Sequence, residues 1–267
     1  MHVASRPRVD LLGVAFDNLS EDEVIDQILT SVAAGAGGSV LTPNIDILRA
    51  VTRDAELRRL ASAATLVVAD GVPLLWAARL ASRPLAGQVA GSSLIFSLSE
   101  AAARRGASIF LLGGAPGVAV AAGKALRERF PGLVVAGVSC PPRGFESDPA
   151  QLSALSAEVA AAEPDIVFCG LGFPKQERVA AALAPAMPAA WFIGCGAAIT
   201  FAAGDIPRAP RWMQRIGLEW VHRLSREPRR LFKRYLIDDL PFALLLLARS
   251  AHLRRRSRSA PNRAGSA

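Results

Sequence analysis

Residues 108–130 have the sequence SIFLLGGAPGVAVAAGKALRERF, in which an apolar run, a glycine-rich turn and an Ala-rich stretch follow one another directly. The run Ser108–Leu112 is short and apolar, as a buried strand requires. The stretch Val118–Phe130 has the apolar spacing of a helix that covers one face of a sheet. This segment therefore predicts a strand that turns directly into a helix.

The same succession recurs on both sides of this segment. Further strands are predicted at Val9–Phe16, Ser39–Leu41, Thr65–Val68, Val134–Val138, Ile166–Cys169 and Trp191–Ile193. Further helices are predicted at Leu94–Arg105, Leu152–Ala162 and Gln176–Leu183. Such alternation is typical of a mainly parallel sheet flanked by helices. We therefore predict a Rossmann-like α/β domain over residues 1–207.

Polar and glycine-rich sequences follow five of the predicted strands. They are Thr42-Pro43-Asn44, Asp70-Gly71, Gly113–Gly117, Gly170–Glu177 and Gly194-Cys195-Gly196. Ligands of such sheets bind beyond the carboxyl ends of the strands, where the strand order reverses. We therefore expect these loops to enclose one polar cleft.

Two of these loops each allow two interpretations. Gly113 and Gly114 precede a helix, so they form either a phosphate-binding loop or a tight turn without a ligand. Asp70 follows a buried strand, so its carboxylate is either a general base at the cleft or the N-cap of a helix over Val72–Leu80. The residues alone leave both choices open.

The remaining motifs favour simpler interpretations. Residues Pro174–Glu177 place polar side chains in the first turn of a helix, and Ser20 is predicted to cap the helix that begins at Glu21. We expect no metal site, because the sequence has no Asp-x-Asp at a strand end and its histidines are isolated.

The cysteines and apolar runs favour a cytosolic protein. Cys140, Cys169 and Cys195 have neither disulfide nor zinc spacing, so we interpret them as buried thiols of a reducing compartment. The N-terminus lacks the apolar core of a signal peptide. The run Leu240–Ala248 is too short to span a bilayer.

Positive charge is concentrated near the C-terminus. From Arg208 onward there are 15 Lys or Arg and 4 Asp or Glu, a net of +11, whereas residues 1–207 carry 16 basic and 19 acidic side chains, a net of −3. Aromatic residues and leucines interleave with the basic ones, which is typical of a helix in an anionic membrane interface. We therefore predict a basic amphipathic helical appendage over residues 208–250 that faces the membrane, and a disordered tail over residues 251–267.

This segment allows two other interpretations. It could be an ordinary packed helix with solvated arginines, or a nucleic-acid-binding surface. The long leucine runs argue against nucleic acid, because a DNA-binding surface has no need of them. Some of the arginines could also neutralise a diphosphate leaving group.

The ordered set of motifs resembles the WecG/TagA/CpsF glycosyltransferases, also called glycosyltransferase family 26, over residues 10–237. The matching pieces are Thr42-Pro43-Asn44, Ala69–Pro73, Gly91-Ser92, Phe110–Gly114, Gly172–Glu177, Ala203-Gly204, Arg208–Trp212, Gly217–Trp220, Arg223-Leu224, Glu227-Pro228 and Arg234-Tyr235.

This resemblance implies an inverting transfer, independent of metals and cofactors, from a UDP-sugar to a saccharide on a polyprenyl-diphosphate carrier. The transferred hexose would be N-acetylmannosamine, its uronic acid or glucose. Asp70 matches the catalytic base. The expected substrate-binding residues are Thr42, Asn44, Gly113, Gly114, Gly172, Pro174, Gln176, Glu177, Arg208, Arg215 and Arg223. The resemblance also implies a peripheral enzyme on the inner face of the cell membrane that forms homo-oligomers.

Two segments depart from the family pattern. The usual Arg-x-x-Gly-Ser-Asp is Gln88–Ser93 here, which removes both charges, and a usual Phe-Asp pair is Ile199-Thr200. Either the sugar specificity is altered or the chain is an inactive paralogue. The sequence leaves two other functions open. One is a nucleotide-sugar-modifying enzyme without a lipid acceptor, and the other is a non-catalytic basic module that binds nucleic acid or nucleotide.

Overall fold

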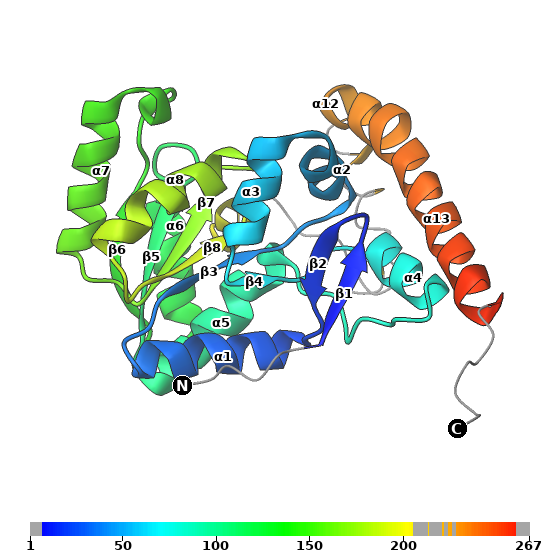
Figure 1. Ribbon diagram of the computed structural model, residues 1–267. Helices are drawn as coiled ribbons and strands as arrows, with labels where there is room; N and C mark the ends of the chain where they lie inside the picture. The colour runs from blue at the N-terminus through cyan, green and yellow to red at the C-terminus, as the bar shows by residue number, and fades with distance from the viewer. Residues whose placement is uncertain (1–6, 205–212, 214–220, 222–223, 226–227, 260–267) are drawn as a thin grey trace.

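A computed structural model describes residues 7–204, 213, 221, 224–225 and 228–259. Its centre is a six-stranded sheet with the strand order β4-β3-β8-β7-β5-β6, and every neighbouring pair is parallel. The strands are β3 (Gly38–Leu41), β4 (Leu66–Val67), β5 (Ser108–Gly113), β6 (Val134–Ser139), β7 (Ile166–Gly170) and β8 (Trp191–Gly194). The predicted Rossmann-like architecture is confirmed (Figure 1).

The prediction of one strand over Val9–Phe16 was wrong. This segment forms an antiparallel hairpin outside the large sheet, with strands β1 (Arg8–Leu11) and β2 (Val14–Asp17). Leu12 and Gly13 have φ angles of 58° and 83°, as a two-residue turn of type I′ requires. The buried carboxylate of Asp17 accepts the Val67 N–H at 2.9 Å and so fixes the hairpin to β4.

Helices cover both faces of the sheet. One face carries α1 (Glu21–Ala33), α5 (Gly91–Arg105), α6 (Val118–Arg129) and α9 (Ala198–Ala202). The other side of the molecule carries α2 (Ile45–Arg53), α3 (Ala55–Ala63), α7 (Pro149–Ala161), α8 (Lys175–Leu183) and the short turns η1 (Phe145–Ser147) and η2 (Ala184–Ala186). The predicted Ser20 cap of α1 is confirmed, with Glu23 completing a capping box.

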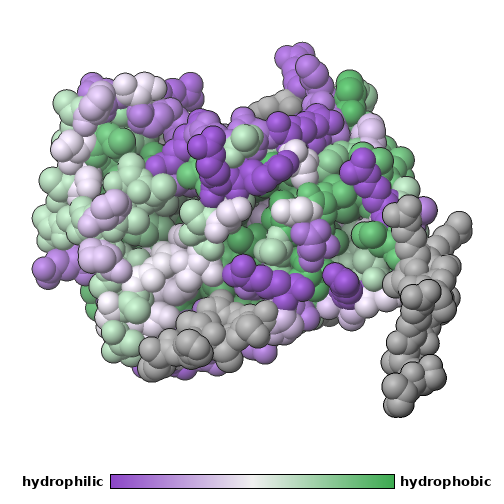
Figure 2. Space-filling view, in the orientation of Figure 1, coloured by the Kyte–Doolittle hydropathy of each residue, from purple (hydrophilic) through white to green (hydrophobic). Residues whose placement is uncertain are grey.

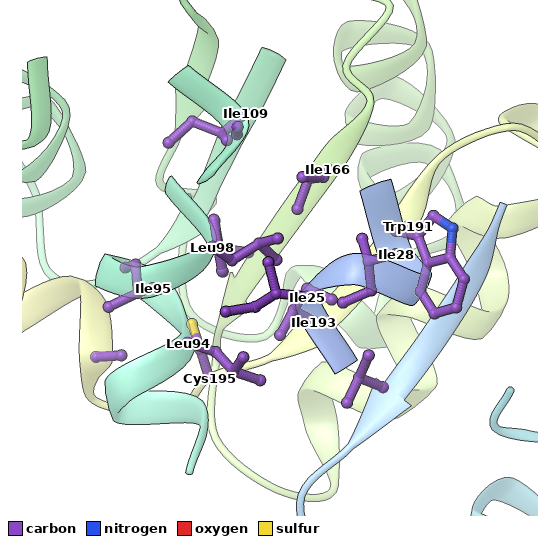
Figure 3. Packing of buried hydrophobic residues seen from close by; sticks show 14 of the residues in the cluster. Ile25, Ile28, Leu94, Ile95, Leu98, Ile109, Ile166, Trp191, Ile193 and Cys195 are labelled. Atoms are coloured by element: carbon purple, nitrogen blue, oxygen red, sulfur yellow. The ribbon is translucent and has the colours of Figure 1, made fainter. Parts of the chain in front are cut away.

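Side chains of each strand alternate between the two faces. Ile166 packs with the cluster beneath α1 and α5, whereas Val167 packs with α7 and α8 on the opposite face. Figure 3 shows Ile25 and Ile28 of α1 packed with Leu94, Leu98, Ile166 and Ile193. Because both faces are covered, the interior strands are apolar throughout, and polar residues are left to the strand ends.

The described part of the C-terminal segment is helical and packs on α2 and α4. It comprises α12 (Pro228–Phe232), the π-helical turn η3 (Lys233–Asp239) and α13 (Leu240–Ser259), while α4 spans Val72–Leu80. Phe242 and Leu246 join the apolar cluster that contains Leu48 and Leu74. α13 reaches Ser259, although a disordered tail was expected from residue 251; residues 260–267 lie outside the described part. No helix in the described residues has the length and apolarity needed to cross a membrane.

A charged network joins this segment to α2. Arg49 donates to Asp46 at 2.7 Å and to Asp239 at 3.3 Å, and its guanidinium lies 3.8 Å from Asp238. Burial and the charge of Asp46 raise the pKa of Asp239 to about 6, against the opposing effect of Arg49 and Arg234. Arg49 therefore neutralises carboxylates that would otherwise repel one another.

Replacement of Arg49 by Met should lower the free energy of unfolding by about 2–3 kcal/mol, because Asp46 and Asp239 lose a charged hydrogen-bond donor and Asp238 loses its ion-pair partner. Urea titration monitored by circular dichroism measures this change. The matched control is Arg53→Met, which alters an exposed arginine on the same helix and should change stability little. Equal stability of the two variants would contradict the structural role of Arg49.

Candidate functional site

The carboxyl ends of the six parallel strands bring the predicted polar loops to one edge of the sheet (Figure 1). Backbone contacts join neighbouring loops there: the Asp70 N–H donates to Pro43 at 2.9 Å, and the Cys195 N–H donates to Cys169 at 3.0 Å. A Cβ on Gly91 would lie 2.8 Å from the Gly194 carbonyl and 3.4 Å from the Thr42 hydroxyl. The start of α5 therefore lies against the ends of β3 and β8.

Asp70 lies just beyond β4 at this edge and is half-buried. Its Oδ1 accepts a hydrogen bond of 3.2 Å from Nε2 of Gln88. The alternative in which Asp70 caps the next helix is wrong: the N-cap of α4 is Gly71, with φ at 129°, and this helix has no side-chain cap. The Asp70 carboxylate therefore lies at this edge of the sheet without capping α4. A carboxylate in such a position can accept a proton from a hydroxyl group.

Thr42 and Asn44 follow β3 on the adjacent loop. Thr42 is buried, and its hydroxyl lies near Gly91. Asn44 is the N-cap of α2, and its Oδ1 accepts the Ile47 N–H at 3.0 Å. The amide oxygen of Asn44 therefore caps α2. The Nδ2 atom of the same amide is the group with which Asn44 can donate a hydrogen bond to a ligand.

Gln176 is buried and joins two loops of the edge. Its Oε1 accepts the N–H groups of Gly172 at 3.2 Å and Gly196 at 3.0 Å, and its Nε2 donates to Oε1 of Glu177 at 2.8 Å. A flipped amide would place Nε2 against two N–H donors and Oε1 against the carboxylate of Glu177. The two N–H groups and Glu177 therefore fix the orientation of the Gln176 amide together. The partners of this amide thus lie within the protein, and it holds the β7–α8 loop against the β8–α9 loop.

Glu177 itself lies below the edge, against a cavity of about 410 Å³ between α3 and α8. Its Oε2 is buried and has no hydrogen-bond partner among the described residues. Burial raises the pKa of Glu177 to about 6. A Cβ on Gly194 would lie 2.8 Å from Oε1 of Glu177, so only glycine leaves room for this cluster.

The glycines after β5 are packed against their neighbours. A Cβ on Gly113 would lie 2.7 Å from the Gly170 carbonyl, and a Cβ on Gly114 would lie 3.3 Å from Val118. Both have positive φ angles, of 114° and 88°. Close packing therefore accounts for Gly113 without a ligand. The helix α6 begins at Val118 after the N-cap Gly117 and has no side-chain cap, while the Val118 N–H donates to the Ala115 carbonyl at 3.0 Å.

The family model described as "Glycosyl transferase WecG/TagA/CpsF family" matches residues 9–257. The chain belongs to this glycosyltransferase family. A relative from Bacillus subtilis (strain 168) is 29% identical over 230 residues, which cover 86% of this chain and 84% of the relative. A relative from Staphylococcus aureus (strain MW2) is 26% identical over 245 residues, which cover 91% and 93%. Both are named N-acetylglucosaminyldiphosphoundecaprenol N-acetyl-beta-D-mannosaminyltransferase.

Within this glycosyltransferase, the structure brings most of the expected site residues to one edge. The residues on loops that follow the strands are Thr42, Asn44, Asp70, Gly114, Gly172 and Pro174. Gly113 is the last residue of β5, and Gln176 lies in the first turn of α8. Glu177 faces the cavity below that edge. Arg208, Arg215 and Arg223 lie outside the described residues. In the described part, no group of three or more His, Cys, Asp or Glu side chains could hold a metal ion.

The positions that depart from the family pattern have partners in this structure. Gln88 contacts Asp70, and the Ser93 hydroxyl donates to Glu21 of α1 at 2.8 Å. Ile199 is buried against Gly170 at the end of β7. Sequence reasoning missed two contacts, the one between Glu21 and Ser93 and the one between Gln88 and Asp70. The residues of each pair are far apart along the chain, so they leave no local sequence pattern.

The cysteines are free thiols. Cys169 and Cys195 are buried, as expected, whereas Cys140 is only half-buried and donates to the Gly114 carbonyl at 3.1 Å. Burial raises the pKa of the Cys169 and Cys195 thiols, and the nearby charge of Glu177 adds to this effect. These two thiols therefore remain protonated near neutral pH.

Replacement of Glu177 by Gln should stabilise the protein relative to wild type as the pH rises. Folding raises the pKa of this carboxyl from 4.5 to about 6, so wild type loses stability between these pH values as the buried group ionises. Between pH 4.5 and pH 7.5, the unfolding free energy of Glu177→Gln should rise by about 2 kcal/mol relative to that of wild type. Urea titrations across this range measure it.

The control for this experiment is Glu163→Gln, since Glu163 lies exposed just after α7. That variant should show no such pH-dependent gain. A constant stability difference between Glu177→Gln and wild type would show that Glu177 is not desolvated in the folded protein.

Proposed function

We propose that this glycosyltransferase moves a hexose from a UDP-sugar to a saccharide on a polyprenyl-diphosphate carrier, with Asp70 as general base and without a metal ion. The observation that carries the proposal is the position of Asp70 at the carboxyl edge of the sheet, on a loop bonded to the one that carries Thr42. The chain also belongs to a family with relatives named for transfer to a diphosphoundecaprenol-linked sugar.

The chemistry follows from this geometry. The acceptor hydroxyl gives its proton to Asp70, and its oxygen forms the new bond to the anomeric carbon. The bond from that carbon to the UDP oxygen breaks on the opposite face, so the configuration inverts. The negative charge that develops on UDP is stabilised by the uncapped first turn of α6 and by arginines of the C-terminal segment.

The second part of the proposal concerns the membrane. Phe242, Leu246 and Ser250 recur every four residues on α13 and are buried, whereas Leu240 and Leu244 lie on the opposite side and are 48% and 59% exposed. Trp76 of the adjacent helix α4 is half-exposed. Figure 2 shows hydrophobic residues interspersed with hydrophilic ones along the side where α4 and α13 lie.

This mixture fits a bilayer surface. Lys233, Arg249 and Arg254 belong to the same segment, and basic residues near an anionic surface contribute about 1 kcal/mol each. A peripheral position on the inner membrane face would place the enzyme where its lipid-linked acceptor lies. Family membership favours this function over a nucleotide-sugar-modifying enzyme or a nucleic-acid-binding module.

Replacement of Asp70 by Asn should reduce transfer at least about a hundredfold while preserving the fold, because the amide cannot accept the proton. The assay incubates radiolabelled UDP-sugars with a short polyprenyl-diphosphate-GlcNAc analogue and measures label in the lipid phase. The control is Asp148→Asn at the N-cap of α7, where Asn caps equally well. Near-normal turnover of Asp70→Asn rules out this base, and a modified free nucleotide sugar would support the alternative enzyme.

Replacement of Leu244 by Glu should weaken binding to vesicles that contain anionic lipid by about tenfold, because burial of a leucine is worth about 1.5–3 kcal/mol. Vesicle co-sedimentation measures this loss. The control Val120→Glu changes a residue of α6 that is 60% exposed and lies outside the C-terminal segment. Equal binding of both variants and wild type would exclude α13 as the membrane-contacting surface.

A further inference from the structure

Helix α4 has two faces of different chemistry. Leu74, Ala77 and Ala78 are fully buried in the apolar cluster that α4 shares with α13 and the hairpin. Trp76 and Arg79 lie on the opposite side, and because they are three positions apart, their side chains are neighbours. Trp76 is 50% exposed, and Arg79 is exposed as well. The outer face of α4 therefore presents an aromatic ring beside a guanidinium group.

The end of the helix adds a second arginine to this face. The Ser82 N–H donates to the Arg79 carbonyl at 3.0 Å, and the Arg83 N–H donates to the Ala78 carbonyl at 2.9 Å. These backbone bonds hold the exposed Arg83 against the last turn of α4. Among the described residues, no carboxylate forms an ion pair with Arg79 or Arg83. Both guanidinium groups can therefore bind an anionic partner.

The chemistry of this face fits the headgroup region of a bilayer. A tryptophan ring is apolar but carries one N–H donor, so it is common where hydrocarbon meets headgroups. Arginines beside it are attracted to the phosphates of anionic lipids. The neighbouring helix α13 packs on α4 and carries the exposed Leu240 and Leu244 of the surface proposed above to contact the membrane. The position of α4 therefore favours a bilayer over a second copy of the chain.

We propose that the outer face of α4, with Trp76, Arg79 and Arg83, binds the headgroup region of an anionic bilayer and gives the enzyme a membrane contact outside its C-terminal segment. This inference rests on the proposed membrane position of the enzyme. Trp76 lies about one and a half turns beyond Gly71, the N-cap of α4, and Asp70 directly precedes that cap. A contact at Trp76 therefore holds the bilayer surface close to the loop that carries Asp70.

The first test measures co-sedimentation of the full chain with vesicles of phosphatidylcholine and phosphatidylglycerol. Trp76→Glu should weaken binding by about tenfold, because a carboxylate replaces an apolar ring in the interface. Arg79→Gln should weaken binding by about fivefold, which is the contribution of one basic residue near an anionic surface. Vesicles of phosphatidylcholine alone should bind Arg79→Gln and wild type equally, because they carry no net charge.

Matched controls for both variants lie on α6. Arg127 is exposed in the last turn of α6, as Arg79 is in the last turn of α4, so Arg127→Gln makes the same change of charge at an equivalent place. Val120→Glu places a carboxylate at a residue that is 60% exposed. Neither control should weaken vesicle binding.

A second test asks whether the ring of Trp76 itself enters the lipid. Bromine atoms on the acyl chains of phosphatidylcholine quench the fluorescence of a tryptophan that enters the bilayer, so binding to such vesicles should reduce the emission of wild type. Trp76→Leu keeps an apolar side chain but removes this fluorophore, so it should still bind and lose less emission. An equal loss of emission from wild type and Trp76→Leu overturns the proposal.

The outcomes separate this proposal from the proposed function. If Leu244→Glu weakens vesicle binding but Trp76→Glu and Arg79→Gln do not, the membrane contact of α13 stands and the proposal for α4 is overturned. If Trp76→Glu changes the oligomeric state, measured by light scattering, and leaves vesicle binding intact, the face binds a second copy and the proposal is again overturned. If wild type itself does not bind the vesicles, the proposed membrane position falls first.

Discussion

Parallel pairing of all six strands is the constraint that places the chemistry of this protein. Parallel neighbours need crossover connections, so helices cover both faces and the interior strands become apolar. Polar side chains are then confined to the strand ends, and all carboxyl ends meet at one edge. Thr42 after β3, Asp70 after β4 and Gly172 after β7 thus lie on the same edge of the sheet, although 130 positions separate the first from the last. The same pairing brings the loops so close that Gly113 and Gly194 have no room for a side chain.

A buried polar cluster below this edge goes against the ordinary preference for apolar interiors. Gln176 satisfies two loop N–H groups, and its orientation depends on a carboxylate that burial makes difficult to ionise. An apolar side chain at residue 176 would leave the N–H groups of Gly172 and Gly196 without this acceptor, and a buried donor without a partner costs about 1–3 kcal/mol. The cluster therefore lowers the stability of the fold but fixes the positions of the loops, as is usual at a site that has to bind and orient a ligand.

The large sheet and most of the loops at its carboxyl edge could be predicted from the sequence, because both depend on local patterns. Apolar runs marked the strands, and glycines and polar residues marked their ends. The hairpin was missed because Val9–Phe16 is apolar enough for one strand, and only the positive φ angles of Leu12 and Gly13 divide it. The end of the C-terminal helix was misplaced because burial of Phe242, Leu246 and Ser250 against α4 and α2 stabilises a helix whose last turns are strongly basic. The contact between Gln88 and Asp70 depends on tertiary structure and has no local signature.

The position of α4 relates Asp70 to the outer surface of the protein. The loop that carries Asp70 continues directly into this helix, and α4 packs in one apolar cluster with the hairpin and with α13. Nine residues of helix span about 13 Å, so Trp76 in the middle of α4 is about two turns or less along the helix from Asp70. On the proposed function, a lipid-linked acceptor must present its sugar to Asp70 while its chain remains in the bilayer. The shared core of α4 and α13 would then set that distance, because a displacement of α13 would also displace the helix that follows Asp70.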